Sequence, residues 1–239
     1  MNYIVEKQPN AETGASDQQT KYMKLIKPST EILTPINRGE ILKFIEIVGR
    51  TCYKSENKIT EGSASKFAKM IVGRGHNSVL EHHSVTVRFT CDRGVSHELV
   101  RHRIASYSQE STRYCNYSKD RFGRELTIVI PPWLPNLKPG HWDTFMTSDE
   151  ISAVEKRWIN AMLNSESFYF SFLDAGWTPQ EARSVLPNSL KTELVATYNL
   201  RQWKEVFKQR CAPAAHPQVR ELMIPLRDKF KSLIPEIYD

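Results

Sequence analysis

Apolar residues recur at two spacings along the chain, and these spacings predict a mixture of helices and strands. Apolar positions three or four residues apart predict helices over residues 40–52, 63–73, 149–174, 179–185, 200–210 and 219–233. Alternating apolar and polar residues predict a strand around residues 85–89, and β-rich composition predicts further strands over residues 22–27, 127–130 and 192–198. The elements do not follow a regular βαβ order, which favours an α+β fold with a mainly antiparallel sheet.

Single residues predict where some of these elements begin, end or bend. Gly94 is expected to break the strand around residues 85–89, and Ser96 is expected to cap a helix that runs to Arg101. Pro225 predicts a kink in the last helix. No internal repeat or linker divides the chain, so a single domain over residues 1–239 is expected, with residues 1–20 flexible.

Composition limits the class of protein and the cell compartment. Hydrophobic residues make up 40% and charged residues 25% of the chain, which is typical of a soluble protein with a sizeable core. No apolar run is long enough to span a membrane, and the first residues lack the order of a signal peptide. The four cysteines are widely spaced and form no CxxC pair, which favours a reducing, cytoplasmic location. The net charge of +6 favours anionic partners, either polymers or small phosphates.

Common nucleotide and metal fingerprints are missing from the sequence. It contains no GxGxxG after a strand, no GxxxxGK[ST] and no HExxH, so a flavin or nicotinamide cofactor is not expected to sit in a Rossmann site. Five histidines lie between His76 and His102, but Arg101 and Arg103 would oppose a cation there. No metal site is therefore expected.

The most unusual stretch is residues 101–114, which contain three arginines, one histidine and three serines. Forked guanidinium donors and short hydroxyl donors in one turn are the groups that phosphate recognition needs. Residues 101–113 also match the pattern RHRxxSxxxxSxR at all six fixed positions: Arg101, His102, Arg103, Ser106, Ser111 and Arg113.

This pattern resembles the signature of flavin-dependent thymidylate synthases. Residues 49–53, 75–82, 183–187 and 199–210 are similar to further segments of that family in the same order, so the resemblance covers roughly residues 45–220. It implies reductive methylation of dUMP to dTMP with 5,10-methylenetetrahydrofolate, and FAD-mediated hydride transfer from NADPH. It also implies a homotetramer with sites shared between chains, Arg183 reaching dUMP from another part of the chain or from another subunit.

The resemblance assigns residues to each ligand. It implies that dUMP is bound by Glu98, Arg101, Gln109, Glu110, Ser111, Thr112, Arg113, Arg183 and Arg210, with Ser111 and Arg113 at the phosphate. It implies that FAD is bound by Ser78, Arg101, His102, Arg103, Gln109, Asn199, Arg201 and Glu205, and that His76 stacks on folate.

Three of these positions depart from the family pattern. Glu98 stands where many relatives have glutamine, which leaves open whether it pairs with Arg101 one helical turn later or contacts the nucleotide. Glu205 stands where some relatives have asparagine, and Gln180 where some have glutamate. The family roles of these three residues therefore stay open.

Arg210 is the expected catalytic residue because the resemblance places it against the uracil ring. The C5 atom of uracil is a weak nucleophile, so negative charge that develops on N3 or the ring oxygens must be stabilised. A fixed guanidinium can do this, an effect of about 3 to 4 kcal/mol for one well-placed donor. Arginine stays protonated at neutral pH, so its contribution is electrostatic and not that of a general acid.

Two other functions follow from the same stretch of sequence. The positive charge of residues 101–113, with interleaved tyrosines, is also what a nucleic-acid-binding module would use, although acidic residues interrupt it. Ser111 invites a nucleophile interpretation, but a serine without an adjacent base is a weak nucleophile, so phosphate binding is favoured.

Overall fold

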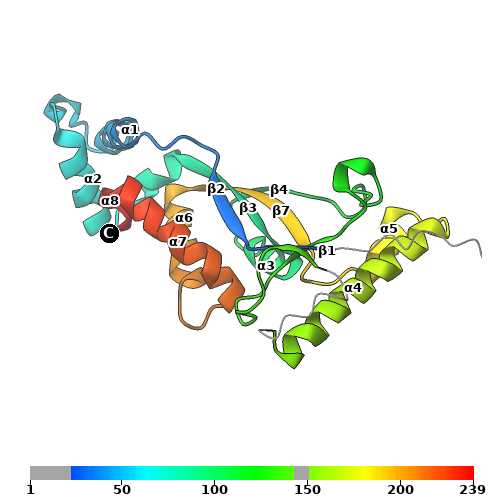
Figure 1. Cartoon of the computed structure of the whole chain (residues 1–239). Helices are drawn as coiled ribbons and strands as arrows, with labels where there is room; N and C mark the ends of the chain where they lie inside the picture. Colours follow the sequence, from blue (N-terminus) through cyan, green and yellow to red (C-terminus); the bar gives the residue numbers. More distant parts are fainter. Residues whose placement is uncertain (1–22, 143–150) are drawn as a thin grey trace, which may run out of the picture.

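The computed structural model describes residues 23–142 and 151–239, which form an elongated molecule with a central sheet and helices at both ends (Figure 1). The helices are α1 (Arg38–Thr51), α2 (Ser63–Gly73), α3 (Arg93–Leu99), α4 (Ala153–Asp174), α5 (Pro179–Ala182), α6 (Leu200–Arg210), α7 (Pro217–Leu233) and α8 (Pro235–Tyr238). Short 3-10 turns are η1 (Glu56–Lys58), η2 (Asn77–His82), η3 (Asp120–Phe122) and η4 (Arg183–Val185).

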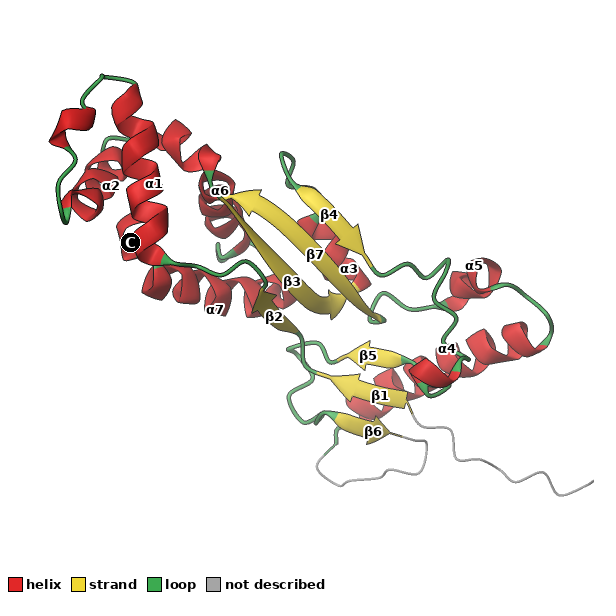
Figure 2. Cartoon of the chain, turned by 90° about the horizontal axis from the view of Figure 1, so that it is seen from above, coloured by secondary structure: helices red, strands yellow, loops and turns green. Residues whose placement is uncertain are grey.

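Seven strands form two sheets within the described residues (Figure 2). They are β1 (Met23–Ile26), β2 (Ser29–Ile32), β3 (Ser84–Asp92), β4 (Ser106–Gln109), β5 (Thr127–Val129), β6 (Gly140–Trp142) and β7 (Lys191–Asn199). The central sheet has the order β2-β3-β7-β4, and all its neighbouring strands are antiparallel. In the smaller sheet, β1 is parallel to β5 and antiparallel to β6. The predicted α+β class is confirmed.

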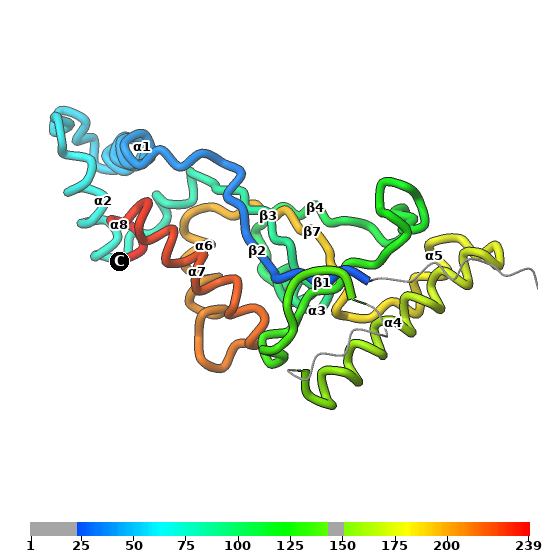
Figure 3. Tube along the Cα trace, in the orientation of Figure 1, coloured from blue at the N-terminus to red at the C-terminus, as the bar shows by residue number. Residues whose placement is uncertain are grey.

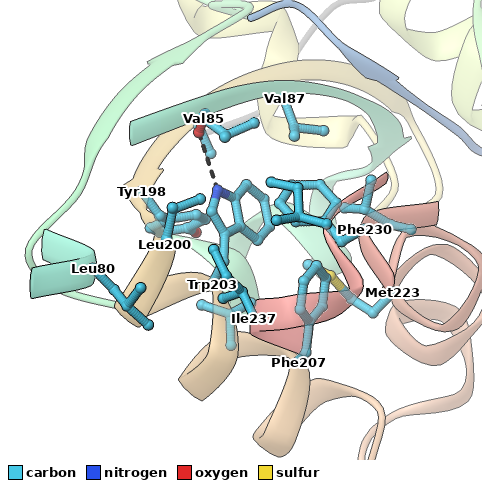
Figure 4. Packing of buried hydrophobic residues seen from close by; sticks show 14 of the residues in the cluster. Leu80, Val85, Val87, Tyr198, Leu200, Trp203, Phe207, Met223, Phe230 and Ile237 are labelled. Atoms are coloured by element: carbon cyan, nitrogen blue, oxygen red, sulfur yellow. Dashed lines mark hydrogen bonds between the residues drawn. The ribbon is translucent and has the colours of Figure 1, made fainter. Parts of the chain in front are cut away.

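One face of the central sheet is covered by helices because β3 and β7 alternate apolar and polar side chains. The apolar residues of β3, and those of β7 other than Val195, are buried, and α6 carries Trp203 against them. The Trp203 ring packs 4.6 Å from that of Tyr198 and 5.2 Å from that of Phe230, measured between centroids. Its indole Nε1 donates to the Val85 carbonyl at 3.1 Å (Figure 4). This core fixes α6, and therefore Arg210, relative to the sheet.

A second apolar cluster lies at the other end of the molecule, between the three-stranded sheet and α4. There the buried carboxylate of Glu166 on α4 accepts a hydrogen bond from the main-chain nitrogen of Leu126 at 2.6 Å. The tube view shows that β1, the first described segment, runs beside the segment of residues 120–142 (Figure 3). The chain thus returns to β1 before it adds β7 to the central sheet.

The predicted helices over residues 63–73 and 200–210 have the predicted bounds, but α3 does not begin where the sequence suggests. Gly94 does not break the strand, since β3 runs to Asp92 and Gly94 lies in the first turn of α3. The N-cap is Asp92, whose carboxylate accepts from the Val95 nitrogen at 2.7 Å. Ser96 lies inside the helix and donates back to the Arg93 carbonyl at 2.9 Å, so its predicted capping role is wrong.

Other differences come from short elements. Strands β2, β4 and β6 were not predicted, because their sequences STEI, SYSQ and GHW are mostly polar or contain glycine and lack the apolar runs of β1 and β5. The predicted start of the long helix at residue 149 falls outside the described residues; α4 begins at Ala153 with a Ser152–Glu155 capping box. Helix α7 continues through Pro225. No helix of the described residues is both long and apolar enough to cross a membrane.

Candidate active site

Arg210, the last residue of α6, is held by two residues from the segment between α3 and β4. Its Nε donates to Nε2 of His102 at 2.7 Å, and Nη1 donates to the Glu98 carboxylate at 2.6 Å. Its Nη2 donates to the main-chain carbonyl of Glu98 at 2.9 Å. These three residues are called the Glu98–His102–Arg210 cluster. A guanidinium has five N–H donors and the cluster uses three of them, so one hydrogen on each terminal nitrogen is not used within it. The Arg210 side chain is 19% exposed, so a ligand can reach it.

His102 is neutral at pH 7 in this cluster. Its residue exposure is 6%, and burial together with the positive charge of Arg210 lowers its pKa to about 4. Because Nε2 accepts from Arg210, the ring proton lies on Nδ1. The Tyr107 hydroxyl lies 2.5 Å from the His102 carbonyl oxygen and 2.9 Å from the Tyr198 hydroxyl oxygen. These contacts fasten the segment before β4 to the sheet.

The possible pairing of Glu98 with Arg101 is not what the structure shows. Glu98 instead pairs with Arg210, which is 112 positions later in the chain. Arg101 is exposed, and no ion pair or side-chain hydrogen bond within the described residues involves it. The contacts of Tyr107 and Tyr198 with this region were missed, because no local sequence signal joins β4 to β7.

Ile104 marks a strained turn between α3 and β4. Its φ of 64° lies in the left-handed region, which β-branched residues rarely adopt, and its side chain is 80% exposed. Arg101 and Arg103 flank this turn and are both exposed. Strained turns of this kind concentrate at functional sites.

At the end of β4, Gln109 and Glu110 are held within the chain. The Gln109 amide nitrogen donates to the Ser96 hydroxyl at 2.8 Å and to the Thr192 hydroxyl at 3.3 Å. The Glu110 carboxylate accepts from the Tyr117 hydroxyl at 3.0 Å and from Lys191 Nζ at 2.9 Å. The donor group of Gln109 and the acceptor group of Glu110 are therefore already occupied in part.

A second group of polar residues gathers where the end of the motif meets α5 and η4. Arg113 Nε donates to the side-chain carbonyl of Gln180 at 3.0 Å, and Arg183 Nη1 lies 3.5 Å from the Thr112 hydroxyl. The side chain of Ser111 only accepts a hydrogen bond from the Arg113 nitrogen, at 3.2 Å. Thr112, Arg113, Gln180 and Arg183 are called the α5 cluster. Arg113 and Arg183 are exposed, and neither forms an ion pair within the described residues.

The predicted flavin and folate residues from the loop before η2 line a cleft of about 330 Å³. His76, Ser78 and Arg201 are among its lining residues, together with Asn77. The Asn77 side-chain oxygen is buried without a hydrogen-bond partner in the described part of the chain. Such an acceptor is costly unless a ligand or solvent satisfies it.

Further predicted flavin residues lie on α6 or at its N-cap. Asn199 caps the helix, since its side-chain oxygen accepts from the Gln202 nitrogen at 2.8 Å. Arg201, which lines the cleft, forms an ion pair with Glu81. Glu205 is exposed on the same helix. The described residues hold no cluster of three or more metal-ligating side chains.

The structure thus brings the predicted residues together in three places: the Glu98–His102–Arg210 cluster, the α5 cluster, and the cleft beside Ser78. Within the described residues of one chain, no side-chain hydrogen bond connects one of these three locations to another.

Comparison with known proteins identifies the family of the whole chain. The family model described as thymidylate synthase complementing protein matches residues 38–236. The chain belongs to the flavin-dependent thymidylate synthase family. A flavin-dependent thymidylate synthase of Geobacter sulfurreducens is 33% identical over 204 residues, covering 81% of this chain and 79% of the relative. That of Mycobacterium avium is 32% identical over 219 residues, covering 90% and 84%.

The family assignment confirms the resemblance inferred from the RHRxxSxxxxSxR pattern, and with it the predicted class of flavin-dependent enzyme. The match also reaches residues 38–44 and 221–236, which lie beyond the expected range of 45–220. The added segment at the end contains most of α7, which packs Met223 and Phe230 into the core beneath α6. That segment supports the site by packing, and it carries no chemical motif that sequence alone would reveal.

Proposed function

We propose that this chain converts dUMP to dTMP, using 5,10-methylenetetrahydrofolate, NADPH and bound FAD, with the three locations described above as parts of the active site. The observation that carries the proposal is the meeting of Glu98, His102 and Arg210. Arg210 lies more than a hundred residues from Glu98 and His102 in sequence, and the family resemblance assigns all three to the nucleotide or the flavin.

Arg210 is proposed to act at the uracil ring as a fixed positive charge. Three of its donors are used by Glu98 and His102, which hold the guanidinium plane in place. The two hydrogens that remain can be directed at ring oxygens or at a deprotonated N3. Because His102 is neutral, it does not compete with Arg210 as a second cation.

The α5 cluster is proposed to bind the dUMP phosphate. Arg113 and Arg183 supply forked donors, and Ser111 supplies a hydroxyl donor that makes no other donor contact in the described residues. Glu110, fixed by Tyr117 and Lys191, is suited to orienting the sugar.

The residues around the Ser78 cleft fit the flavin. The buried, unpartnered oxygen of Asn77 requires a donor, and an isoalloxazine or ribityl group offers such donors. Arg101 and Arg103 are exposed cations suited to the FAD pyrophosphate. Bound FAD supplies the hydride chemistry; the protein residues bind and orient the three reactants and exclude water.

We also propose a cytoplasmic homotetramer in which chains share sites. This is supported by the placement of the Glu98–His102–Arg210 cluster and the α5 cluster at opposite ends of β4 within one chain, since both are assigned to dUMP. The exposed arginines are proposed to serve small anions and not nucleic acid, because Glu98 and Glu110 interrupt the positive charge.

The test is single-turnover and steady-state assay of the flavin-loaded protein. NADPH oxidation is followed with dUMP and methylenetetrahydrofolate present together or omitted one at a time, and dTMP is measured by chromatography. We expect dTMP only in the complete mixture. A protein that stays colourless when offered FAD, or that forms no dTMP, contradicts the proposal; steeply salt-dependent binding to long DNA would support the nucleic-acid alternative.

A further inference from the structure

A second, larger cleft opens between α1, η1 and α2, next to the Ser78 cleft. Its volume is about 570 Å³, and it shares Tyr53, Ile71 and His76 with the smaller cleft. A ligand can therefore extend from one cleft into the other. Neither the resemblance nor the family match assigns a role to this space.

The shape of this cleft follows from the close packing of α1 on α2. A Cβ atom at Gly49 would lie 2.6 Å from Cε1 of Phe67, so only glycine permits this approach. Phe67 and Ile71 are buried at the base of the cleft, and Arg50 stacks over the Phe67 ring at 4.8 Å. The base is apolar and preformed.

The walls of the cleft carry only positive charge. Among the residues that the structure describes, four cationic side chains and no acidic one line it: Arg50, Lys58, Lys66 and Arg74. Arg50 is neutralised by Glu46, whose other carboxylate oxygen accepts from Ser63 at 2.8 Å. The other three cations are exposed and form no ion pair or side-chain hydrogen bond within the described residues.

The unpaired cations are spread out and do not converge on one point. Lys66, Met70 and Arg74 are four residues apart, so they follow one face of α2, and the first and last are about 12 Å apart along the axis. Lys58 lies on the opposite wall, in η1. A single phosphate is bound by donors that converge from several sides, whereas this spacing suits a chain of separated carboxylates.

We propose that this cleft, called the α1–α2 cleft, binds the glutamate tail of the folate co-substrate. Resting on the proposed function, it places the folate ring beside His76, where this cleft meets the flavin-binding Ser78 cleft, and the tail along Lys66, Arg74 and Lys58. The apolar base accommodates the aminobenzoyl group. Several glutamates in the tail bind more tightly than one, because each added carboxylate meets another unpaired cation.

The test compares tetrahydrofolate carrying one glutamate with tetrahydrofolate carrying five. Binding of each to the flavin-loaded protein with dUMP is measured by titration calorimetry, and KM is measured for the methylene forms. We expect the five-glutamate form to bind about tenfold more tightly, equivalent to about 1.4 kcal/mol. This advantage shrinks in 0.3 M salt, because exposed charge pairs are screened.

The variant Lys66→Gln/Arg74→Gln should lose most of this advantage and bind the one-glutamate form nearly unchanged. Both side chains are exposed and unpaired, so the fold is retained. The control Lys43→Gln/Lys69→Gln removes the same charge from exposed positions of α1 and α2 that do not line the cleft, and it should keep the advantage. Arg50 is left intact because it neutralises the buried Glu46.

The proposal is overturned if the wild-type protein binds both folates with equal affinity. It is also overturned if the Lys43→Gln/Lys69→Gln control loses as much of the five-glutamate advantage as the Lys66→Gln/Arg74→Gln variant does. A selective rise in KM for NADPH in the Lys66→Gln/Arg74→Gln variant, with the folate preference unchanged, overturns it in favour of the phosphates of NADPH. These results are separable from failure of the proposed function, which would appear as absence of dTMP with the one-glutamate folate.

Discussion

The Glu98–His102–Arg210 cluster and the α5 cluster flank the same strand, β4, but they differ in how fully their side chains are engaged. In the first, one guanidinium makes three hydrogen bonds to residues of one segment, and His102 is buried. In the second, Arg113 has a single amide partner and Arg183 a single contact of 3.5 Å, and both remain exposed. The Glu98–His102–Arg210 cluster therefore holds a positive charge in place before a ligand binds. The arginine donors of the α5 cluster are instead left for a ligand to engage.

This difference follows from where each cluster is anchored. Arg210 ends a helix that Trp203 fixes to the central sheet, so its position is determined by the core. The α5 cluster rests on a four-residue helix and a 3-10 turn, which are supported mainly by the second apolar cluster. Substitutions in the first cluster should therefore affect catalysis and stability together, and those in the second should affect ligand affinity alone.

The largest expected effect is that of Arg210→Ala. It removes the proposed charge at the uracil ring, so we expect the rate of dTMP formation to fall about 10²- to 10³-fold. It also leaves the Glu98 carboxylate without its partner, so the melting temperature should fall. Arg210→Lys keeps the charge but cannot make the three anchoring contacts, so it should recover only part of the rate. A rate within tenfold of wild type in Arg210→Ala would show that this charge is not used.

The next effect concerns the pH dependence of stability. Since folding lowers the pKa of His102 from 6.5 to about 4, the unfolded chain binds the proton more readily. Neutral His102 contributes fully to the free energy of unfolding above pH 6.5. This contribution is lost as the pH falls toward 4, which lowers the free energy of unfolding by roughly 3 kcal/mol. Urea unfolding between pH 4 and 8 should show this loss in the wild type.

The variant His102→Gln isolates the contribution of His102 because it cannot titrate, while its amide oxygen can still accept from Arg210. Its stability should change less than that of the wild type over the same pH range. Parallel pH profiles for the two proteins would show that His102 is not held neutral by this cluster.

The sequence predicts these two clusters unequally well. The α+β class, the strand predicted over residues 192–198 and the helix that ends at Arg210 follow from local composition and periodicity, which a single segment carries by itself. The contact of Glu98 with Arg210 does not follow, because it depends on two helices meeting across more than a hundred residues. Helical spacing suggested Arg101 as the partner of Glu98, but α3 ends at Leu99 and the chain turns at Ile104.

The residues of the α5 cluster follow from the family pattern, but their arrangement does not. The pattern identifies Ser111 and Arg113 without showing that Gln180 holds Arg113. Nor can one sequence show how residues of neighbouring chains complete a site, since that depends on surfaces built from distant segments. The assembly therefore stays a proposal.

A smaller effect is expected for Arg113→Ala in the α5 cluster. Because Arg113 is exposed, its loss should leave the melting temperature and flavin content nearly unchanged. Binding of dUMP should weaken about tenfold, the loss of one charge-assisted contact. Calorimetric titration with dUMP and flavin absorbance measure the two quantities on one sample. Equal loss of both ligands would contradict the assignment of Arg113 to the phosphate.

The smallest effect is expected for Gln180→Ala, which tests whether the α5 cluster is preformed at all. Gln180 is exposed, and its contact with Arg113 in the free protein exchanges for water at little cost. An exposed substitution of this kind usually changes stability by less than about 0.5 kcal/mol, so dUMP affinity should change by no more than roughly twofold. If Gln180→Ala instead weakens dUMP binding as much as Arg113→Ala does, the amide positions the guanidinium before the ligand arrives. The two ends of β4 would then follow one principle, with each arginine fixed in advance by a neighbouring side chain.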